Sequence, residues 1–186
     1  IDYLLKKNKV DVITGYGKVK TGNKVSVTAD GASTDYSAKH IIIATGARSR
    51  ELPNLQQDGK KVIGYREALS LPTAPKKMVI VGSGAIGVEF AYFYNAMGAD
   101  VTIVEFMPNI VPNEDRDISI QLNKSFKKLG INVLTKSSVE KVDFDKNNDC
   151  IVSIKNESGI EKINCDIVLS AVGVESNIEN IGLEEV

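Results

Sequence analysis

Hydrophobic and polar positions alternate in two parts of the chain, and this alternation predicts short antiparallel strands there. The first part contains KVSVTAD at 24–30, a turn signal at Asp30-Gly31, and a returning strand over 34–38. The second contains VEKVDFD at 139–145 and CIVSIKN at 150–156, which bracket a hairpin turn, followed by IEKIN at 160–164. We therefore expect two small β-meanders, separated by more than a hundred residues.

Continuous apolar runs between and after the meanders have the length of strands that are covered on both faces of a sheet. They are HIIIATG at 40–46, MVIV at 78–81, VTIV at 101–104, INVLT at 131–135 and DIVLSAVG at 166–173. Helical patterns occupy 1–9, 66–70, 85–97 and 113–129, and the last of these aligns Ile118, Leu122, Phe126 and Leu129 on one face. The stretch 48–61, with a proline and a glycine, reads as a linker.

The runs HIIIATG and DIVLSAVG have the same form, and each follows a set of short antiparallel strands. This internal echo indicates the end of one domain followed by most of a second domain built on the same plan. We expect an α/β fold, Rossmann-like and three-layered, with a parallel sheet and an antiparallel β-meander. The domain ranges expected are 1–52, 53–176 and 177–186, the last being a return toward the first domain.

A glycine motif lies between the strand at 78–81 and the helix that follows it. Gly82, Gly84 and Gly87 form G-x-G-x-x-G directly after the strand and directly before the helix, which is the context that a dinucleotide site needs. The first glycine permits the tight turn, the second leaves room for a pyrophosphate, and the third lets the helix pack closely on the strand. The pyrophosphate is then held by free N–H groups at the helix N-terminus.

Two carboxylates accompany this motif. Glu105 ends the next strand, where a carboxylate accepts hydrogen bonds from both ribose hydroxyls of NAD and repels the 2′-phosphate of NADP. The ten residues that follow it, 106–115, contain neither Arg nor Lys, which also favours NAD. Glu89 lies near the start of the helix, where it either stabilises the helix dipole or meets the nicotinamide carboxamide.

Composition adds few further candidates. The net charge is −1, so a phosphate must be bound by local geometry and not by a basic surface, and nucleic-acid binding is not indicated. Cys150 and Cys165 do not form a CxxC pair and read as reduced thiols, and His40 belongs to no metal-ligand cluster. The chain has no signal-peptide pattern and no apolar run long enough for a membrane span, and it does not begin with Met.

Five segments together resemble the lipoamide-dehydrogenase branch of the flavin-dependent pyridine nucleotide–disulfide oxidoreductases. They are GYGKV at 15–19, IIIATGARSRELP at 41–53, VIVGSGAIGVEFA at 79–91, GADVTIVEFMPNIVPNEDRDIS at 98–119 and AVGVESNIENIGLEEV at 171–186. In that family an NAD domain interrupts an FAD domain and a dimerisation domain follows. The resemblance implies that 1–52 is the closing part of an FAD domain and that 53–176 is the NAD domain.

The resemblance also assigns site residues. Contacts to FAD are implied for Gly17, Thr45, Gly46 and Ala47. Contacts to NAD are implied for the loop Gly82, Ser83, Gly84, Ala85, Ile86, Gly87, Val88 and Glu89, with Glu105 on the ribose, Val139 near adenine and Gly173 near nicotinamide. For Val139 an ordinary core position, and for Thr45 and Gly46 a plain turn, remain alternatives.

Several family features are absent from these 186 residues: the first GxGxxG that binds FAD, the CxxxxC redox disulfide, and the C-terminal His-Glu pair. Ser176 also stands where the family usually has proline. We therefore expect an NAD(H)-binding fragment, inactive alone, of an enzyme that oxidises dihydrolipoamide through FAD with NAD as acceptor. Alternatives are another member of the superfamily (transhydrogenase, mercuric reductase or NADH oxidase) or a non-catalytic NAD-binding module.

The resemblance further implies partners and location for the intact enzyme. These are a homodimeric state, lipoyl-bearing subunits of 2-oxo acid dehydrogenase complexes as partners, and a cytoplasmic or organelle-matrix location. Neither nucleic acid nor a membrane is expected as a partner, and secretion is not expected.

Overall fold

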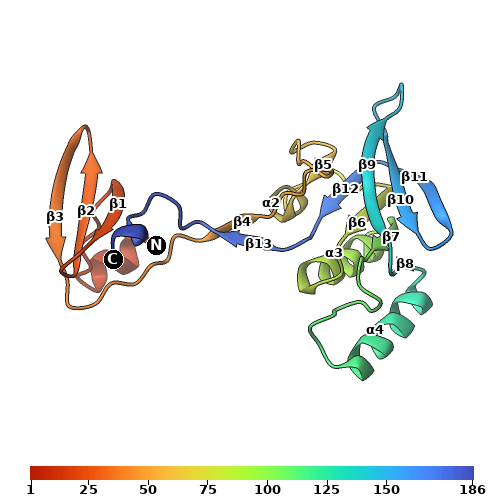
Figure 1. Cartoon of the computed structure of the whole chain (residues 1–186), viewed down its shortest axis with the longest axis horizontal. Coiled ribbons are helices and arrows are strands. Elements are labelled where there is room, and N and C mark those ends of the chain that lie inside the picture. Colours follow the sequence, from red (N-terminus) through yellow and green to blue (C-terminus); the bar gives the residue numbers. More distant parts are fainter. The chain divides into compact units, whose positions relative to one another are not determined.

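The computed structural model of the protein describes all residues from 1 to 186. The chain divides into two compact units, which are described separately (Figure 1). Unit 1 contains Ile1–Ala47 and Ser176–Val186, and unit 2 contains Arg48–Glu175. No helix of the chain is both long enough and apolar enough to cross a bilayer.

Unit 1 is built on an antiparallel meander. It contains α1 (Asp2–Lys7), β1 (Tyr16–Lys20), β2 (Lys24–Ala29), β3 (Ala32–Ser37) and the 3₁₀ turn η1 (Leu183–Glu185), with strand order β1-β2-β3. Asp30 and Gly31, between β2 and β3, both have positive φ, as a two-residue hairpin turn requires. The last residues return to this meander, where the Val19 N–H donates to the Ile181 carbonyl at 2.7 Å. The expected first meander is thus confirmed.

The strand expected over 40–46 is wrong. These residues form no strand, and the Ile42 side chain is 89% exposed. An apolar run becomes a strand only when a neighbouring strand accepts and donates its backbone hydrogen bonds. No strand of the chain pairs with this run; pairing begins only at β4 (Ala47–Ser49), which forms a two-stranded sheet with β13 (Val174–Ser176).

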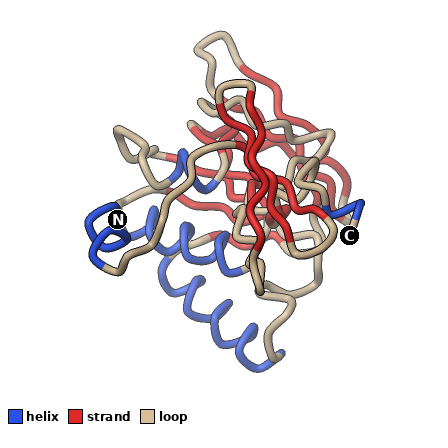
Figure 2. Tube along the Cα trace, turned by 90° about the vertical axis from the view of Figure 1, so that its left-hand side faces the viewer, coloured by secondary structure: helices blue, strands red, loops and turns tan.

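Unit 2 has three layers. The middle layer is a parallel sheet in the order β5-β12-β6-β7-β8, whose strands are Val62–Ile63, Ile167–Ser170, Lys77–Val81, Asp100–Val104 and Asn132–Leu134. The helices α3 (Ala85–Ala96) and α4 (Arg116–Leu129) lie on one side of it, and the short α2 (Tyr65–Ala68) precedes β6. The antiparallel meander β9 (Ser138–Phe144), β10 (Cys150–Asn156) and β11 (Gly159–Cys165) lies on the other side (Figures 1 and 2).

Two apolar cores hold these layers together, and the strand alternation decides which residue enters which core. Met78 and Ile80 of β6 point into the core under the helices, and Val79 and Val81 point into the core under the meander. Because both faces are covered, every residue of this strand after Lys77 is buried. The expected α/β fold with a parallel sheet and an antiparallel meander is therefore confirmed.

Helix α4 differs in detail from the prediction. It begins at Arg116 because the Asp115 side chain accepts a hydrogen bond from the Asp117 N–H at 2.8 Å and so caps the helix. Ile118 is 58% exposed, and the side that packs on the core carries Phe126 and Leu122. The expected apolar face of this helix is thus only partly correct.

Candidate functional site

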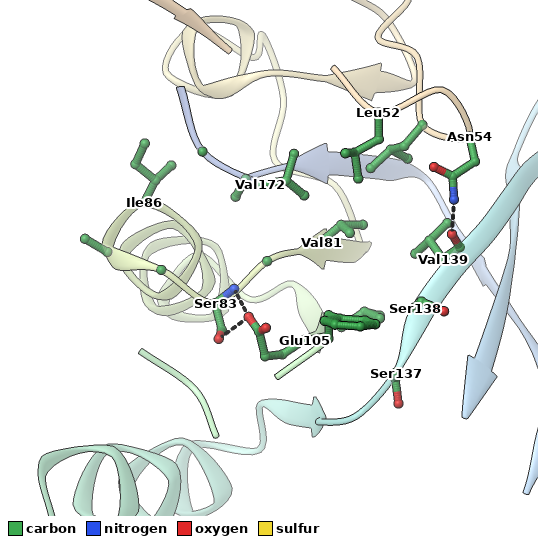
Figure 3. Close-up of a pocket in the computed structure, with 18 of the residues that line it drawn as sticks. Leu52, Asn54, Val81, Ser83, Ile86, Glu105, Ser137, Ser138, Val139 and Val172 are labelled. Carbon is green, nitrogen blue, oxygen red and sulfur yellow. Dashed lines mark hydrogen bonds between the residues drawn. The ribbon is translucent and has the colours of Figure 1, made fainter. Parts of the chain in front are cut away.

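A cleft of about 570 Å³ opens at the carboxyl ends of β6, β7 and β12 in unit 2 (Figure 3). From β6 the chain continues through β7 to β8 on one side of the sheet and later adds β12 on the other side. The cleft therefore lies where the strand order changes direction, the place at which open α/β sheets bind their ligands. Its lining comes from the loop after β6, the ends of β7 and β12, the start of β9, and residues 52–55.

The three motif glycines face different surroundings. Gly82 has φ +97°, and a Cβ there would lie 2.5 Å from the Ala171 carbonyl oxygen. At Gly87 a Cβ would lie 2.1 Å from the Gly82 carbonyl oxygen, so the helix can approach the loop only without a side chain. A Cβ on Gly84 would have no atom within 4 Å. The protein itself therefore requires glycine at the first and third positions, and it leaves the space beside the second one open.

The N-terminus of α3 is prepared for an anion. Its N-cap is Gly84, which supplies no capping side chain, and its first turn carries no acidic residue. By contrast, α4 has both a capping Asp115 and Asp117 in its first turn. The first N–H groups of a helix have no partners within the helix, and the helix dipole makes this end positive. The arrangement at α3 suits a phosphate group.

Glu105 is fixed at the floor of the cleft. Its side chain is only 6% exposed, and its Oε2 atom accepts hydrogen bonds from the N–H of Ser83 at 2.8 Å and from the Ser83 hydroxyl at 2.5 Å (Figure 3). Its Oε1 atom accepts from the Met107 N–H at 2.7 Å. A carboxylate oxygen can accept two hydrogen bonds, so Oε1 retains capacity for a donor in the cleft.

Ser83 does not present its hydroxyl to the cleft as a direct ligand. The side chain is fully buried and turned toward Glu105, and the Ser83 carbonyl accepts from the Val111 N–H at 2.9 Å. Ser83 therefore joins the glycine loop to the end of β7 and to the loop that follows it.

Val139 reaches the cleft because β9 contains a bulge. Ser153 pairs with Lys141 but Ile154 pairs with Val139, so Glu140 is one extra residue in this strand. The bulge compensates for the three-residue spacing between Val139 and Val142, and both valines then pack in the same core. Val139 is 5% exposed and lines the cleft, and its carbonyl accepts a hydrogen bond from the Asn54 side chain (Figure 3).

The structure brings most of the expected NAD residues together. Gly82, Ser83, Gly84, Ala85, Ile86, Glu105, Val139 and Gly173 all line the cleft. Gly87 is buried beneath the loop, and Val88 packs against the core under the helices. Glu89 is exposed and is not among the lining residues. Its place beside the nicotinamide therefore stays a prediction.

The residues expected to contact FAD belong to unit 1. Gly17 is exposed in the middle of β1, and Ala47 begins β4. The Thr45 and Gly46 carbonyls accept hydrogen bonds from the side chain and the backbone N–H of Asn177, at 3.2 and 3.0 Å. The turn at 45–46 is thus fastened to the returning chain, and its contact with a flavin stays a prediction.

Part of the lining was missed by the sequence analysis. Residues 48–61 read as a linker, yet Leu52 and Leu55 form a turn, closed by a 2.9 Å hydrogen bond from the Leu55 N–H to the Leu52 carbonyl. Leu55 is 2% exposed and enters the core under the meander, which places Asn54 beside Val139. Proline and polar residues surround these two leucines, so no periodic pattern marks them.

Comparison with known proteins defines the class first. All residues from 1 to 186 match the pyridine nucleotide-disulphide oxidoreductase family, and the chain belongs to that family. This confirms the resemblance inferred from the sequence motifs.

Two curated relatives of the chain are dihydrolipoyl dehydrogenases. Dihydrolipoyl dehydrogenase from Zymomonas mobilis is 45% identical over 184 residues, which is 98% of this chain and 39% of the relative. Dihydrolipoyl dehydrogenase from Rhizobium etli is 41% identical over an alignment of 200 residues, which covers 99% of this chain and 41% of the relative. The chain therefore spans about 40% of the length of these curated relatives.

A solved structure shows the same arrangement of elements. The crystal structure of LpdA from Mycobacterium tuberculosis matches with a TM-score of 0.85 at 28% identity, over 100% of this chain and 41% of that one. The flavoprotein disulfide reductase RclA from Escherichia coli matches with a TM-score of 0.77 at 25% identity, over 100% of this chain and 43% of that one.

Proposed function

We propose that unit 2 binds NAD(H) in the cleft at the carboxyl ends of β6, β7 and β12. The observation that carries the proposal is the open space beside Gly84 at an uncapped helix N-terminus. A pyrophosphate placed there receives backbone N–H groups and the positive end of the helix dipole. The chain needs no basic side chain for this, in keeping with its net charge of −1.

The adenosine half of the cofactor lies toward Glu105 and Val139. The remaining acceptor capacity of Glu105 takes a ribose hydroxyl, while its buried negative charge opposes a 2′-phosphate. Val139 offers an apolar surface to the adenine, and Gly173, which follows β12 on the side of β6 away from β7, lies toward the nicotinamide. Glu89 is assigned to the nicotinamide carboxamide by the family resemblance alone.

The intact protein, in this proposal, is a dihydrolipoyl dehydrogenase that oxidises dihydrolipoamide with NAD as the final acceptor. The names of the relatives support this reading. The family resemblance implies FAD as the second cofactor and lipoyl-bearing subunits of 2-oxo acid dehydrogenase complexes as partners. Gly17, Thr45, Gly46 and Ala47 would contribute to the FAD site. The cofactors supply the hydride chemistry, and this chain's residues bind and orient the nicotinamide nucleotide.

The 186 residues alone should have no dihydrolipoamide dehydrogenase activity. Their two cysteines are buried, Cys150 at the start of β10 and Cys165 at the end of β11, and they are not spaced in the sequence as a CxxxxC redox pair. The single histidine, His40, lies in unit 1. Binding of NADH, and not turnover, is therefore the property to measure.

Titration calorimetry with NADH and NADPH tests the proposal. We expect NADH to bind the chain about tenfold more tightly than NADPH, a difference of about 1.4 kcal/mol, because Glu105 opposes the additional phosphate. Glu105→Gln should reduce this preference. Glu161→Gln, which makes the same change on the exposed strand β11, is the matched control and should not. An absence of NADH binding at millimolar concentration would contradict the NAD(H) site, and equal affinities would contradict the ribose assignment.

A further inference from the structure

The two cysteines of the chain face each other across neighbouring strands. Cys150 begins β10 and Cys165 ends β11, and the register places them directly opposite each other. Both thiols are free, and they are 0% and 3% exposed within the core under the meander. They lie 15 positions apart in the sequence, so only the hairpin brings them together.

The register gives this pair a Cα spacing that a disulfide can span. The hairpin ends in the pair Asn156 and Gly159 around a two-residue turn, a closing pair that exchanges hydrogen bonds in tight hairpins. Hydrogen-bonded and non-bonded pairs alternate along the strands, and Cys150 with Cys165 is six pairs away, so it is again of the hydrogen-bonded kind. Such pairs have Cα atoms about 5.5 Å apart, within the range of about 4.4–6.8 Å that disulfides adopt.

The surroundings make the two thiols unequal. The Lys61 ammonium and the Cys150 sulfur both contact the Asp166 carbonyl, at 3.1 and 3.9 Å, and the ammonium also binds the Asp149 side chain at 3.2 Å. A hydrogen bond from Cys165 lowers the pKa of the Cys150 thiol, and the Lys61 charge adds to this, against the opposing effects of burial and of the Asp58 and Asp149 charges. The hydrogen bond with Cys150 and burial both raise the pKa of the Cys165 thiol. Cys150 is therefore the stronger nucleophile of the pair.

We propose that Cys150 and Cys165 are a site of reversible oxidation, at which a hydroperoxide converts the two thiols into a cross-strand disulfide. The Cys150 thiol gives up its proton, and the thiolate sulfur attacks one peroxide oxygen. The O–O bond breaks, and the hydroxide that leaves combines with the released proton to form water. The Cys165 sulfur then attacks the sulfenic sulfur of Cys150, and its proton leaves with the sulfenic oxygen as a second water. The two sulfurs lose two electrons and the peroxide gains two.

The site is independent of the proposed NAD(H) cleft. Cys150 Sγ lies 3.9 Å from the Lys61 and Asp166 carbonyls, which precede β5 and β12, so the pair is at the amino ends of these strands. The cleft is at the carboxyl ends of the strands. The disulfide would fasten β10 to β11, with a stabilisation that grows with the length of the closed loop. Hydrogen peroxide is small, as the burial of both sulfurs requires.

Mass spectrometry of the folded chain after hydrogen peroxide treatment tests the proposal. We expect the mass to fall by two hydrogens, both thiols to disappear together, and the peptides that contain Cys150 and Cys165 to be linked within one chain. The thermal midpoint of unit 2 should rise by roughly 5 °C, and dithiothreitol should reverse both changes. Free thiols after treatment, oxygen added to one cysteine without linkage, a link between two chains, or a link formed only in urea would each overturn it.

A pair of lysine variants tests the role of Cys150 as the attacking thiol. Lys61→Gln removes the charge beside this sulfur and should slow the loss of thiols in peroxide several-fold. Lys60→Gln makes the same change at the exposed neighbouring position and should leave the rate as in the unmodified chain. Equal rates for the two variants would overturn the assignment of Cys150.

Discussion

At the scale of single residues, two hydrogen bonds join Ser83 to Glu105 in the cleft. A buried carboxylate needs donors, and Glu105 obtains two of its three from Ser83 and the third from Met107. These three bonds fix the orientation of the Glu105 carboxylate in the cleft. In the proposed NAD(H) site, Ser83 would therefore be a positioning residue that acts through Glu105.

Ser83→Ala should weaken NADH binding by about fivefold, because the lost hydroxyl bond costs about 1 kcal/mol of carboxylate positioning. It should also narrow the preference for NADH over NADPH, since the carboxylate can turn away from the ribose. The measurement is calorimetric titration with both nucleotides. Ser125→Ala, which removes a half-buried hydroxyl that donates to the Gln121 carbonyl of α4, is the matched control. An unchanged NADH to NADPH ratio in Ser83→Ala would show that this hydroxyl does not position Glu105.

Alanine at Gly84 should affect mainly NADH binding, whereas alanine at Gly87 should affect the unfolding free energy. At Gly84 the methyl group meets no protein atom within 4 Å, so the unfolding free energy should stay within about 0.5 kcal/mol while NADH binding falls at least tenfold. At Gly87 the methyl group meets the Gly82 carbonyl, so the unfolding free energy should fall by about 3 kcal/mol. Urea unfolding and NADH titration of both variants separate the two effects. Normal NADH binding by Gly84→Ala would mean that the cofactor does not occupy this space.

At the scale of elements, a side chain holds the turn before β5. One carboxylate oxygen of Asp58 accepts from the N–H groups of Lys60, Lys61 and Val62 at 2.8, 2.7 and 3.0 Å. Partial burial works to raise the pKa of Asp58, but these three donors outweigh it and the net pKa is lowered from 3.8. The charged form is thus favoured in the folded state.

The stability that Asp58 contributes should depend on pH. Because the folded pKa is lowered, the contribution is fully present above the ordinary carboxyl pKa of 3.8 and is lost as the pH falls through the lowered folded value. Asp58→Ala should lower the unfolding free energy by about 1 kcal/mol at pH 7, a value reduced by solvent screening of this exposed group. Urea unfolding between pH 7 and pH 2 measures the difference, with the exposed Asp11→Ala as control. A difference that is the same at every pH would contradict the assignment.

The elements also show how far the sequence alone predicts the fold. The unit from β6 through the glycine loop to α3 and β7 was predicted because its signals are local: an apolar run, three glycines and a helical stretch. The run at 40–46 has an equally strong signal but forms no strand, because a strand depends on a partner that no pattern in the run can supply. The bulge at Glu140 was not predicted, since it is defined by pairing with β10.

The same distinction applies to the candidate site. The loop residues and Glu105 were found from their spacing, whereas Asn54 and Leu55 were missed because they reach the cleft through tertiary contacts with Val139 and the core. The hydrogen bonds between Ser83 and Glu105 also cannot be predicted from the sequence, because they depend on how the two residues meet in the fold. The sequence places both residues near the cofactor but does not show that one holds the other.

At the scale of the whole molecule, the two compact units have different assignments. Unit 2 carries the complete cleft, and the residues assigned to FAD lie in unit 1. The predicted domain ranges and the flavin contacts remain predictions. The chain spans about 40% of the length of its curated relatives. The cleft in unit 2 is therefore the site that can be tested directly with these 186 residues.

Chemical-shift mapping of the 20.2 kDa chain during NADH titration is the strongest test of the NAD(H) cleft, because it locates the binding site as well as detecting it. If NADH binds in the cleft, the amide signals of the Gly82–Gly87 loop, Glu105, Val139 and Gly173 should shift and saturate together. Signals of β1, β2 and β3 in unit 1 should stay in place. Signals that remain unchanged at millimolar NADH, or shifts confined to residues outside the cleft, would contradict the assignment of this cleft as an NAD(H) site.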